Sequence, residues 1–466
     1  MTGQDRPFDT DEARRLLRRR IAQVIANSPH PINSLDILGQ LRTSRMLPRK
    51  EPISRLRLER MMLNECHKKD GLFVKLPGSQ FELRDRIELR LRIVSRLSNQ
   101  GFRVGPDGTI NRPSMDDKEL LRKYHTAARS HKYNIMREFL REKESGLLDF
   151  FADGDEIDIG AFSPRLRIVK PNSPYSDLFR YASLLWSVPV SEGFGRRIRF
   201  LLIDESNGKL IGLFAVGDPV FNLRCRDEWI GWNSQQRMKR LYNVMDIFVL
   251  GAVPPYSNLL CGKLVALTAA SNEVRNTVAR KYRGTQTIIN KEKKDSRLVL
   301  LTTGSALGKS SLYDRVKFDG QLVYQRIGAS QGWGHFQFND GMFKDMIDYV
   351  SLSNPKLVHS NRFGQGPNWK FRISRMCLES LGLGKILQQH GIAREIYAIP
   401  LASNFREFLL DETKTPHYYN RPFDPMVSFF RERWMVGRAE RCPDYKGHKR
   451  QDVSAAIHSA GKPQES

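Results

Sequence analysis

Two apolar segments joined by a short polar turn constrain the fold of this chain more than any other feature. Residues 198–204 have the sequence IRFLLID, residues 209–219 have the sequence KLIGLFAVGDP, and ESNG joins them. Asn-Gly between two apolar runs is the strongest short signal for a β-hairpin, because both residues tolerate the positive φ of a tight turn. The segment therefore predicts two buried antiparallel strands within a β-meander.

The sequence around this hairpin predicts a mixed α/β domain over residues 160–345. The expected elements are a helix at 177–188, strands at 243–258 and 298–303, a helical segment at 259–284 that breaks near Ser271-Asn272, and a second hairpin at Asp319-Gly320.

Residues 1–150 are predicted to be helical and basic, with 31 Lys and Arg against 20 Asp and Glu. Helices are expected at 11–27 and 54–71, followed by a small hairpin at 73–83. Helix, helix, hairpin is the order of a winged helix, a common reader of duplex DNA. A helical bundle with a solvated basic face fits the same pattern, and both interpretations stay open.

The predicted fold class is therefore α+β. A basic helical region, either a winged helix or a bundle, covers residues 1–150, and the mixed α/β domain covers 160–345. A helical and loop-rich part is expected over 346–440, with a flexible tail over 441–466.

The charge of the chain indicates its class of partner. Lys and Arg number 76 against 51 Asp and Glu, which gives a net charge of +25. Such a field concentrates polyanions and releases counterions when they bind, which favours nucleic acid as the partner. We expect DNA, although charge does not distinguish DNA from RNA. An acidic protein or an anionic membrane surface is the alternative.

The missing secretory signal and the pattern of cysteines predict a cytoplasmic protein. The N-terminus lacks the apolar core of a secretory signal, and no run of about 18 apolar residues is long enough for a membrane span. The five cysteines are scattered without C-x-x-C spacing, so we expect reduced thiols and assign no metal site. The oligomeric state is not predicted.

The stretch TTGSALGKSSLYDR, residues 302–315, resembles a P-loop that binds ATP. Only three residues separate Gly304 from Gly308 where the motif needs four, and the two-turn helix expected from Ser310 leads into a hairpin rather than a crossover. We therefore predict a tight turn ending in a serine-capped helix. Lys309, Arg315 and Lys317 in or beside this turn are candidate phosphate contacts, and a solvated turn is the alternative.

Two other segments contain candidate nucleic-acid contacts. SQGWGHFQF, residues 330–338, contains Trp333 and His335, which we expect to be exposed and able to stack on bases, whereas Phe336 and Phe338 are expected in the core. RMKRLYN contains Arg237, Lys239 and Arg240, which are candidate contacts for backbone phosphate or, alternatively, a solvated charged face.

Signals for catalysis are weak. Neither H-E-x-x-H nor G-x-S-x-G occurs. Paired carboxylates of the central domain are able to hold Mg²⁺ in a nuclease, and the candidates are Asp204, Glu205, Asp218, Asp227, Glu228 and Asp246. Because the first pair lies at a hairpin turn, we assign no catalytic residue and no cofactor, and we favour a protein that is not an enzyme.

The order of several motifs over residues 165–440 resembles the DruA family, proteins of the Druantia anti-phage defence system with relatives carried by transposon-like elements. These motifs are Trp229–Trp232, Asn258, Gly308–Arg315, Gly332–His335 and the late FFRERW. The resemblance implies antiviral defence in a bacterium or archaeon, alongside a large helicase-like partner.

The central pattern is also similar to the core of a GNAT acetyltransferase, in which a hairpin precedes a strand that runs into a helix. In that fold the strand-to-helix turn carries R/Q-x-x-G-x-G/A, whose amides hold the pyrophosphate of coenzyme A. Here the turn is GAVPPYSNLLCG, residues 251–262, in which two prolines without N–H groups replace glycines. This departure weighs against acetyl-CoA binding.

These observations predict a defence-system subunit that binds nucleic acid through its N-terminal region and its central loops. Two alternatives stay open. One is an enzyme that acts on phage DNA, either a GNAT-like transferase or a metal-dependent nuclease. The other is a structural scaffold for the helicase-like partner.

Overall fold

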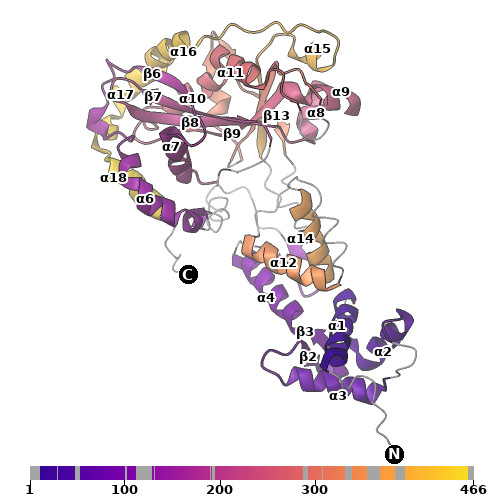
Figure 1. The fold of residues 1–466 in the computed structure, drawn as a ribbon. Helices are drawn as coiled ribbons and strands as arrows, with labels where there is room; N and C mark the ends of the chain where they lie inside the picture. Colours follow the sequence, from indigo (N-terminus) through magenta and orange to yellow (C-terminus); the bar gives the residue numbers. More distant parts are fainter. Residues whose placement is uncertain are drawn as a thin grey trace, which may run out of the picture. The chain divides into compact units, whose positions relative to one another are not determined.

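The computed structural model describes residues 11–28, 30–47, 53–99, 102–111, 129–130, 132–188, 190, 195–286, 292–306, 308–330, 338, 340–353, 368–383 and 394–459. The chain divides into two compact units (Figure 1). One unit contains residues 1–114 and 333–391, and the other contains residues 115–332 and 392–466. The fold is α+β, as predicted.

The second unit is built on a mixed seven-stranded sheet with the order β13-β14-β10-β9-β8-β7-β6. The parallel pair in this sheet is β9 with β10, and the other neighbouring strands run antiparallel. The strands are β6 (Pro164–Ile168), β7 (Arg197–Asp204), β8 (Lys209–Gly217), β9 (Val244–Ala252), β10 (Leu300–Gly304), β13 (Gln325–Ala329) and β14 (Glu395–Pro400).

The helices described for this unit are α6 (Arg137–Leu148), α7 (Pro174–Ala182), α8 (Arg224–Ile230), α9 (Ser234–Arg240), α10 (Cys261–Ala269), α11 (Asn272–Tyr282), α15 (Phe405–Leu409), α16 (Phe423–Phe430), α17 (Val436–Arg441) and α18 (Arg450–Ser459). Across the described ranges of the chain, no helix combines the length and the apolar character that crossing a bilayer requires.

The predicted hairpin is confirmed as β7 and β8. Gly208 has a φ of 74°, and its amide donates a hydrogen bond of 2.7 Å to the carbonyl oxygen of Asp204. A second small hairpin, predicted at Asp319-Gly320, is also present, formed by β11 (Lys317–Phe318) and β12 (Gln321–Leu322). In both cases the turn residues alone were sufficient to fix the connection.

Both faces of the large sheet are covered, which explains why β7 and β8 are apolar throughout. Phe200 and Leu202 of β7 belong to the core beneath α10 and α11. Leu201 and Ile203 point to the opposite face and pack in the core that includes α7. Figure 1 shows α10 and α11 on one side of the strands and α7 on the other.

The predicted break in the helical segment after β9 is confirmed between α10 and α11. The Ser271 hydroxyl accepts a hydrogen bond of 3.4 Å from the amide of Val274, so it caps the start of α11. A serine cap satisfies an amide at the helix start, which has no partner inside the helix. One polar residue in an apolar run therefore set this boundary.

The first unit places two later helices beside the N-terminal elements. Its small sheet has the order β1-β3-β2, and α12 contacts α1, α4 and α14. The elements are α1 (Asp11–Asn27), β1 (Ile32–Asn33), α2 (Ser34–Thr43), α3 (Arg55–Cys66), β2 (Phe73–Leu76), β3 (Gln80–Leu83), α4 (Arg84–Asn99), β4 (Arg103–Val104), β5 (Ile110–Asn111), α12 (Asp340–Ser353) and α14 (Asn368–Ser380).

This grouping differs from the division expected from the sequence. We expected residues 346–440 to form one C-terminal part, whereas residues up to 391 belong to the first unit and the following residues to the second. Hydrogen bonds show how α4 and the end of α14 are joined, since Arg90 Nε donates to the carbonyl of Leu381 at 3.2 Å. An apolar helix face in the sequence does not identify the element that covers it.

Residues 450–459, which we expected in a flexible tail, form α18. Its first residue is tied down because the Arg450 amide donates to the Asp153 carboxylate at 2.7 Å. Near its end, Ser454 donates to Glu144 at 2.9 Å, and His458 Nε2 lies 2.7 Å from the same carboxylate. The first residue of the helix is therefore fixed by Asp153, which follows α6, and Ser454 and His458 join the rest of the helix to Glu144 of α6.

We expect Glu144→Gln to lower the free energy of unfolding at neutral pH by about 1–3 kcal/mol, because charge-assisted hydrogen bonds to a half-buried carboxylate are lost. Burial raises the pKa of Glu144, but hydrogen bonds from His458, Tyr181 and Ser454 outweigh it and hold the pKa below its usual range. A pKa lowered by folding stabilises the protein above the unfolded value and ceases to do so as the pH falls through the folded value.

The check is thermal unfolding of both proteins from neutral pH to below about pH 4, the ordinary range of a glutamate. The stability difference between wild type and variant should shrink as the pH falls. Glu138→Gln is the control, because Glu138 lies on the same helix with a side chain that is 79% exposed. A stability difference independent of pH would contradict this prediction.

Candidate nucleic-acid interface

The basic residues of α9 are already neutralised by carboxylates. A guanidinium nitrogen of Arg237 lies 3.0 Å from a carboxylate oxygen of Asp227. Lys239 and Arg240 both form ion pairs with Asp411, and Arg240 is buried. These three predicted contacts therefore lie together on one helix, but their charges are used in ion pairs with Asp227 and Asp411 that join α9 to neighbouring segments.

The cations in and beside the turn after β10 have a different environment. Lys309, Arg315 and Lys317 are exposed, and within the described part of the chain none of the three forms an ion pair. An exposed cation without a carboxylate partner is available to a phosphate group at no cost of breaking an existing pair. These residues are therefore better placed than the α9 cations to bind a polyanion.

Ser310 holds the backbone of this turn in place. Its hydroxyl accepts a hydrogen bond of 3.3 Å from the amide of Tyr313, whereas the N-cap position of the following 3-10 turn is Leu312, which makes no side-chain capping bond. The amide of Ser310 donates to the hydroxyl of Tyr397 at 3.4 Å. The helix that follows is a single 3-10 turn, Tyr313–Arg315, rather than the two turns predicted, because the β11–β12 hairpin begins at once.

Two further cations join Arg315 near the start of α10. Burial lowers the pKa of the Lys263 ammonium, and the positive charges of Arg315 and Arg433 lower it further. The same ammonium lies 4.4 Å from the ring centroid of Trp434. Because the three cations repel one another, an anion bound among them would relieve that repulsion. We refer to Lys263, Arg315, Arg433 and Trp434 as the α10 cluster.

The first turn of α10 adds to the positive potential of the cluster. Leu260 occupies the N-cap position with a φ of 62°, makes no side-chain capping bond, and is followed by no acidic residue in the first turn. A Cβ added to Gly262 would lie 4.0 Å from Leu312, so the turn before Arg315 packs beside these amides. The amides of Cys261 and Lys263 in this turn donate to the carbonyl oxygens of Tyr256 and Leu260, so the contribution to an anion comes from the helix dipole.

The carboxylates considered as metal ligands are engaged in other contacts. Asp218 pairs with Arg196 at 2.6 Å. Asp246 accepts hydrogen bonds from the Thr302 hydroxyl and, at 3.0 Å, from the Val220 amide, and burial raises the pKa of its carboxyl group. Among the residues that the structure describes, no group of three or more His, Cys, Asp or Glu side chains is arranged to hold a metal ion.

The remaining predicted contacts, Trp333 and His335, lie outside the described residues. Sequence reasoning missed Lys263 and Arg433 as members of the site. A signal for Arg433 was available, because RERW places cations directly beside Trp434. No signal pointed to Lys263, whose role follows from the packing of the turn after β10 against α10.

The fold and the cluster define a protein whose mixed α/β sheet unit presents cations around a helix N-terminus that pair with no carboxylate among the residues described. Residues 115–411 match the family model described as "DruA: Druantia protein DruA". The chain is also 40% identical to the Druantia protein DruA of Escherichia coli (strain UMEA 4076-1) over 367 residues, which cover 78% of this chain and 91% of that protein. The chain therefore belongs to the DruA family. No solved structure matches it.

Proposed function

We propose that the chain is a nucleic-acid-binding subunit of an anti-phage defence system and that it works with a helicase-like partner. Membership of the DruA family supports the defence role. The α10 cluster is the observation that carries the binding role, because its cations repel one another and form no ion pair with a described residue, whereas those of α9 are paired. DNA is the expected ligand, in keeping with the net charge of +25.

The order of elements in the first unit supports a winged helix as a second point of contact. Helices α1, α2 and α3 precede the β2–β3 hairpin, and β1 pairs with β3. In such domains the third helix enters the major groove. On α3, Leu56 is 80% exposed, and Arg60 and Asn64 are exposed at four-residue spacing, so the three share one solvent-facing side.

We further propose that the sheet of the second unit is a GNAT-like scaffold reused for binding polyanions. Its strand order, with one parallel pair at β9 and β10, and the passage of β9 into α10 support this comparison. In this chain Pro254 and Pro255 occupy the turn where the acetyltransferases have glycines, and cations surround the helix start. Phosphates of a nucleic acid would then occupy the position that a cofactor pyrophosphate takes in that family.

The proposal is tested by fluorescence anisotropy of the whole chain with a labelled duplex and a labelled single strand across a range of salt concentrations. The logarithm of the association constant should fall linearly with the logarithm of salt concentration. Each phosphate contact contributes about 0.9 to that slope on duplex DNA, so the three cations of the cluster predict a slope of at least about 2.7. Failure to bind either nucleic acid at low salt would overturn the proposal.

A further inference from the structure

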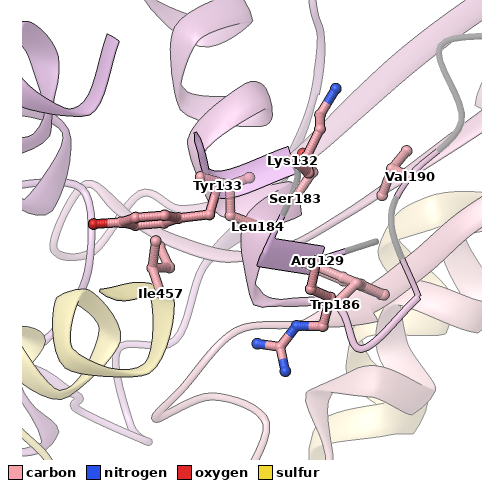
Figure 2. A pocket seen from close by; sticks show the side chains of 8 residues that line it. All are labelled: Arg129, Lys132, Tyr133, Ser183, Leu184, Trp186, Val190 and Ile457. Carbon is pink, nitrogen blue, oxygen red and sulfur yellow. The ribbon is translucent and has the colours of Figure 1, made fainter. Parts of the chain in front are cut away.

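The pocket drawn in Figure 2 has no room for a ligand. Tyr133, Trp186 and Ile457 are among the residues that line it, and its volume is about 20 Å³, which admits about one water molecule. The surface of α3 in the first unit (Figure 1) has a different interest. Its side chains are distributed in a way that contact with solvent alone does not explain.

Helix α3 keeps its two carboxylates in contacts within the first unit. The side chain of Glu65 is 6% exposed and pairs with Arg18 at 3.0 Å, and it also pairs with Lys68. Glu59 is half-buried and accepts a hydrogen bond of 3.1 Å from the hydroxyl of Ser34 in α2. Both negative charges of this helix are therefore already compensated.

The exposed side of α3 begins with an apolar residue. Leu56, in the first turn, is 80% exposed, and Arg60 and Asn64 follow it at four-residue spacing and are also exposed. Glu65 lies nine residues after Leu56, about two and a half turns further on, and therefore on the opposite side. A helix that packs for stability alone places leucine inside and glutamate outside, whereas α3 does the reverse at these two positions.

The three exposed side chains match the groups that base pairs display in the major groove. Apolar side chains contact the C5-methyl group of thymine, arginine donates to guanine, and asparagine pairs with adenine. Arg60 forms no ion pair with any residue that the structure describes. Burying an uncompensated cation against an apolar protein surface is costly, so a polyanion fits this side of α3 better than another protein does.

We propose that Leu56 contacts the 5-methyl group of a thymine in the major groove and gives the first unit a preference for that base. The inference rests on the proposed binding of duplex DNA and specifies one contact within it. Ser54 fixes the backbone from which Leu56 projects, because its hydroxyl accepts a hydrogen bond of 3.3 Å from the amide of Arg57. Since one methyl group is covered, the contact should contribute about fourfold to affinity.

Selection from two libraries of randomised duplexes tests this contact, one made with thymine and the other with deoxyuridine, which lacks only the methyl group. Wild type should enrich a thymine at a fixed position in the first library and show no preference for deoxyuridine there in the second. In the enriched duplex, deoxyuridine at that position should weaken wild-type binding about fourfold by fluorescence anisotropy. Leu56→Ala should bind both duplexes equally, because it has already lost the contact.

Leu91→Ala is the matched control, since Leu91 is 61% exposed on α4 of the same unit. It should keep both the thymine preference and the effect of deoxyuridine. Leu56→Met, which keeps an apolar side chain at the position, should retain most of that effect. Circular dichroism checks that all three variants are folded.

Duplex binding by wild type without a thymine preference would overturn the inference, and so would equal effects of deoxyuridine on wild type and Leu56→Ala. Analytical ultracentrifugation of the free chain covers the alternative occupant. A dimer that Leu56→Ala dissociates would overturn the inference in favour of a contact between two copies. Failure of wild type to bind any duplex would instead count against the proposed function.

Discussion

The double variant Lys263→Glu/Arg315→Glu is expected to bind duplex DNA about a hundredfold more weakly than wild type at moderate salt, with a salt slope smaller by about 2. Two phosphate contacts are replaced by two repulsive charges in a site where the cations lie close together. Fluorescence anisotropy over a salt series gives both quantities, and circular dichroism checks that the variant is folded.

A matched control separates the effect of this site from that of net charge. Arg141 and Lys170 are exposed cations outside the α10 cluster, so Arg141→Glu/Lys170→Glu changes the net charge equally. This control should lose only the small, general part of the affinity that follows from the overall field. Equal losses in the two double variants would mean that the cluster has no special role.

The second large effect is expected on stability. Arg226→Met should lower the free energy of unfolding by about 3 kcal/mol, because Asp227 keeps only Arg237 as an arginine partner and two backbone carbonyl oxygens lose their buried donor. The Arg226 side chain is fully buried. Its guanidinium donates to the Asp227 carboxylate at 2.8 and 2.7 Å, and to the carbonyl oxygens of Val220 at 2.7 Å and Phe221 at 3.1 Å.

Arg224→Met is the control for that variant, because Arg224 lies two residues earlier in α8. Its side chain is 75% exposed and pairs with Glu228 at 2.7 Å. Exposed pairs of this kind contribute about 0–1 kcal/mol, so the control should unfold close to the wild-type urea midpoint. If Arg226→Met lost no more stability than Arg224→Met, the buried pair would not hold the segment before α8 in place.

Local chemistry explains why much of the second unit was predictable. Asn207-Gly208 and Asp319-Gly320 each determined a turn, and Ser271 determined the break between two helices. In each case a residue next to the feature supplied the required φ or hydrogen bond. The length of the helix after Ser310 was overestimated, because the hairpin that follows left room for only one turn.

The candidate site was less predictable, because charge compensation acts over long distances in sequence. Lys239 and Arg240 look like free cations until Asp411, some 170 residues later, is placed beside them. Lys263 and Arg315 approach each other only through the packing of the turn after β10 on α10. A run of basic residues therefore indicates the sign of a surface, while the fold decides which of its charges are available.

Photochemical cross-linking shows which residues of the chain contact bound DNA. The full chain would be irradiated in complex with a duplex that contains iodouracil, and the labelled peptides would be identified by mass spectrometry. We expect labelling of peptides that contain Trp434, Lys263 or Arg315, with loss of that labelling in Lys263→Glu/Arg315→Glu. Labelling confined to α9, around Arg237 and Lys239, and unchanged in the double variant would contradict it.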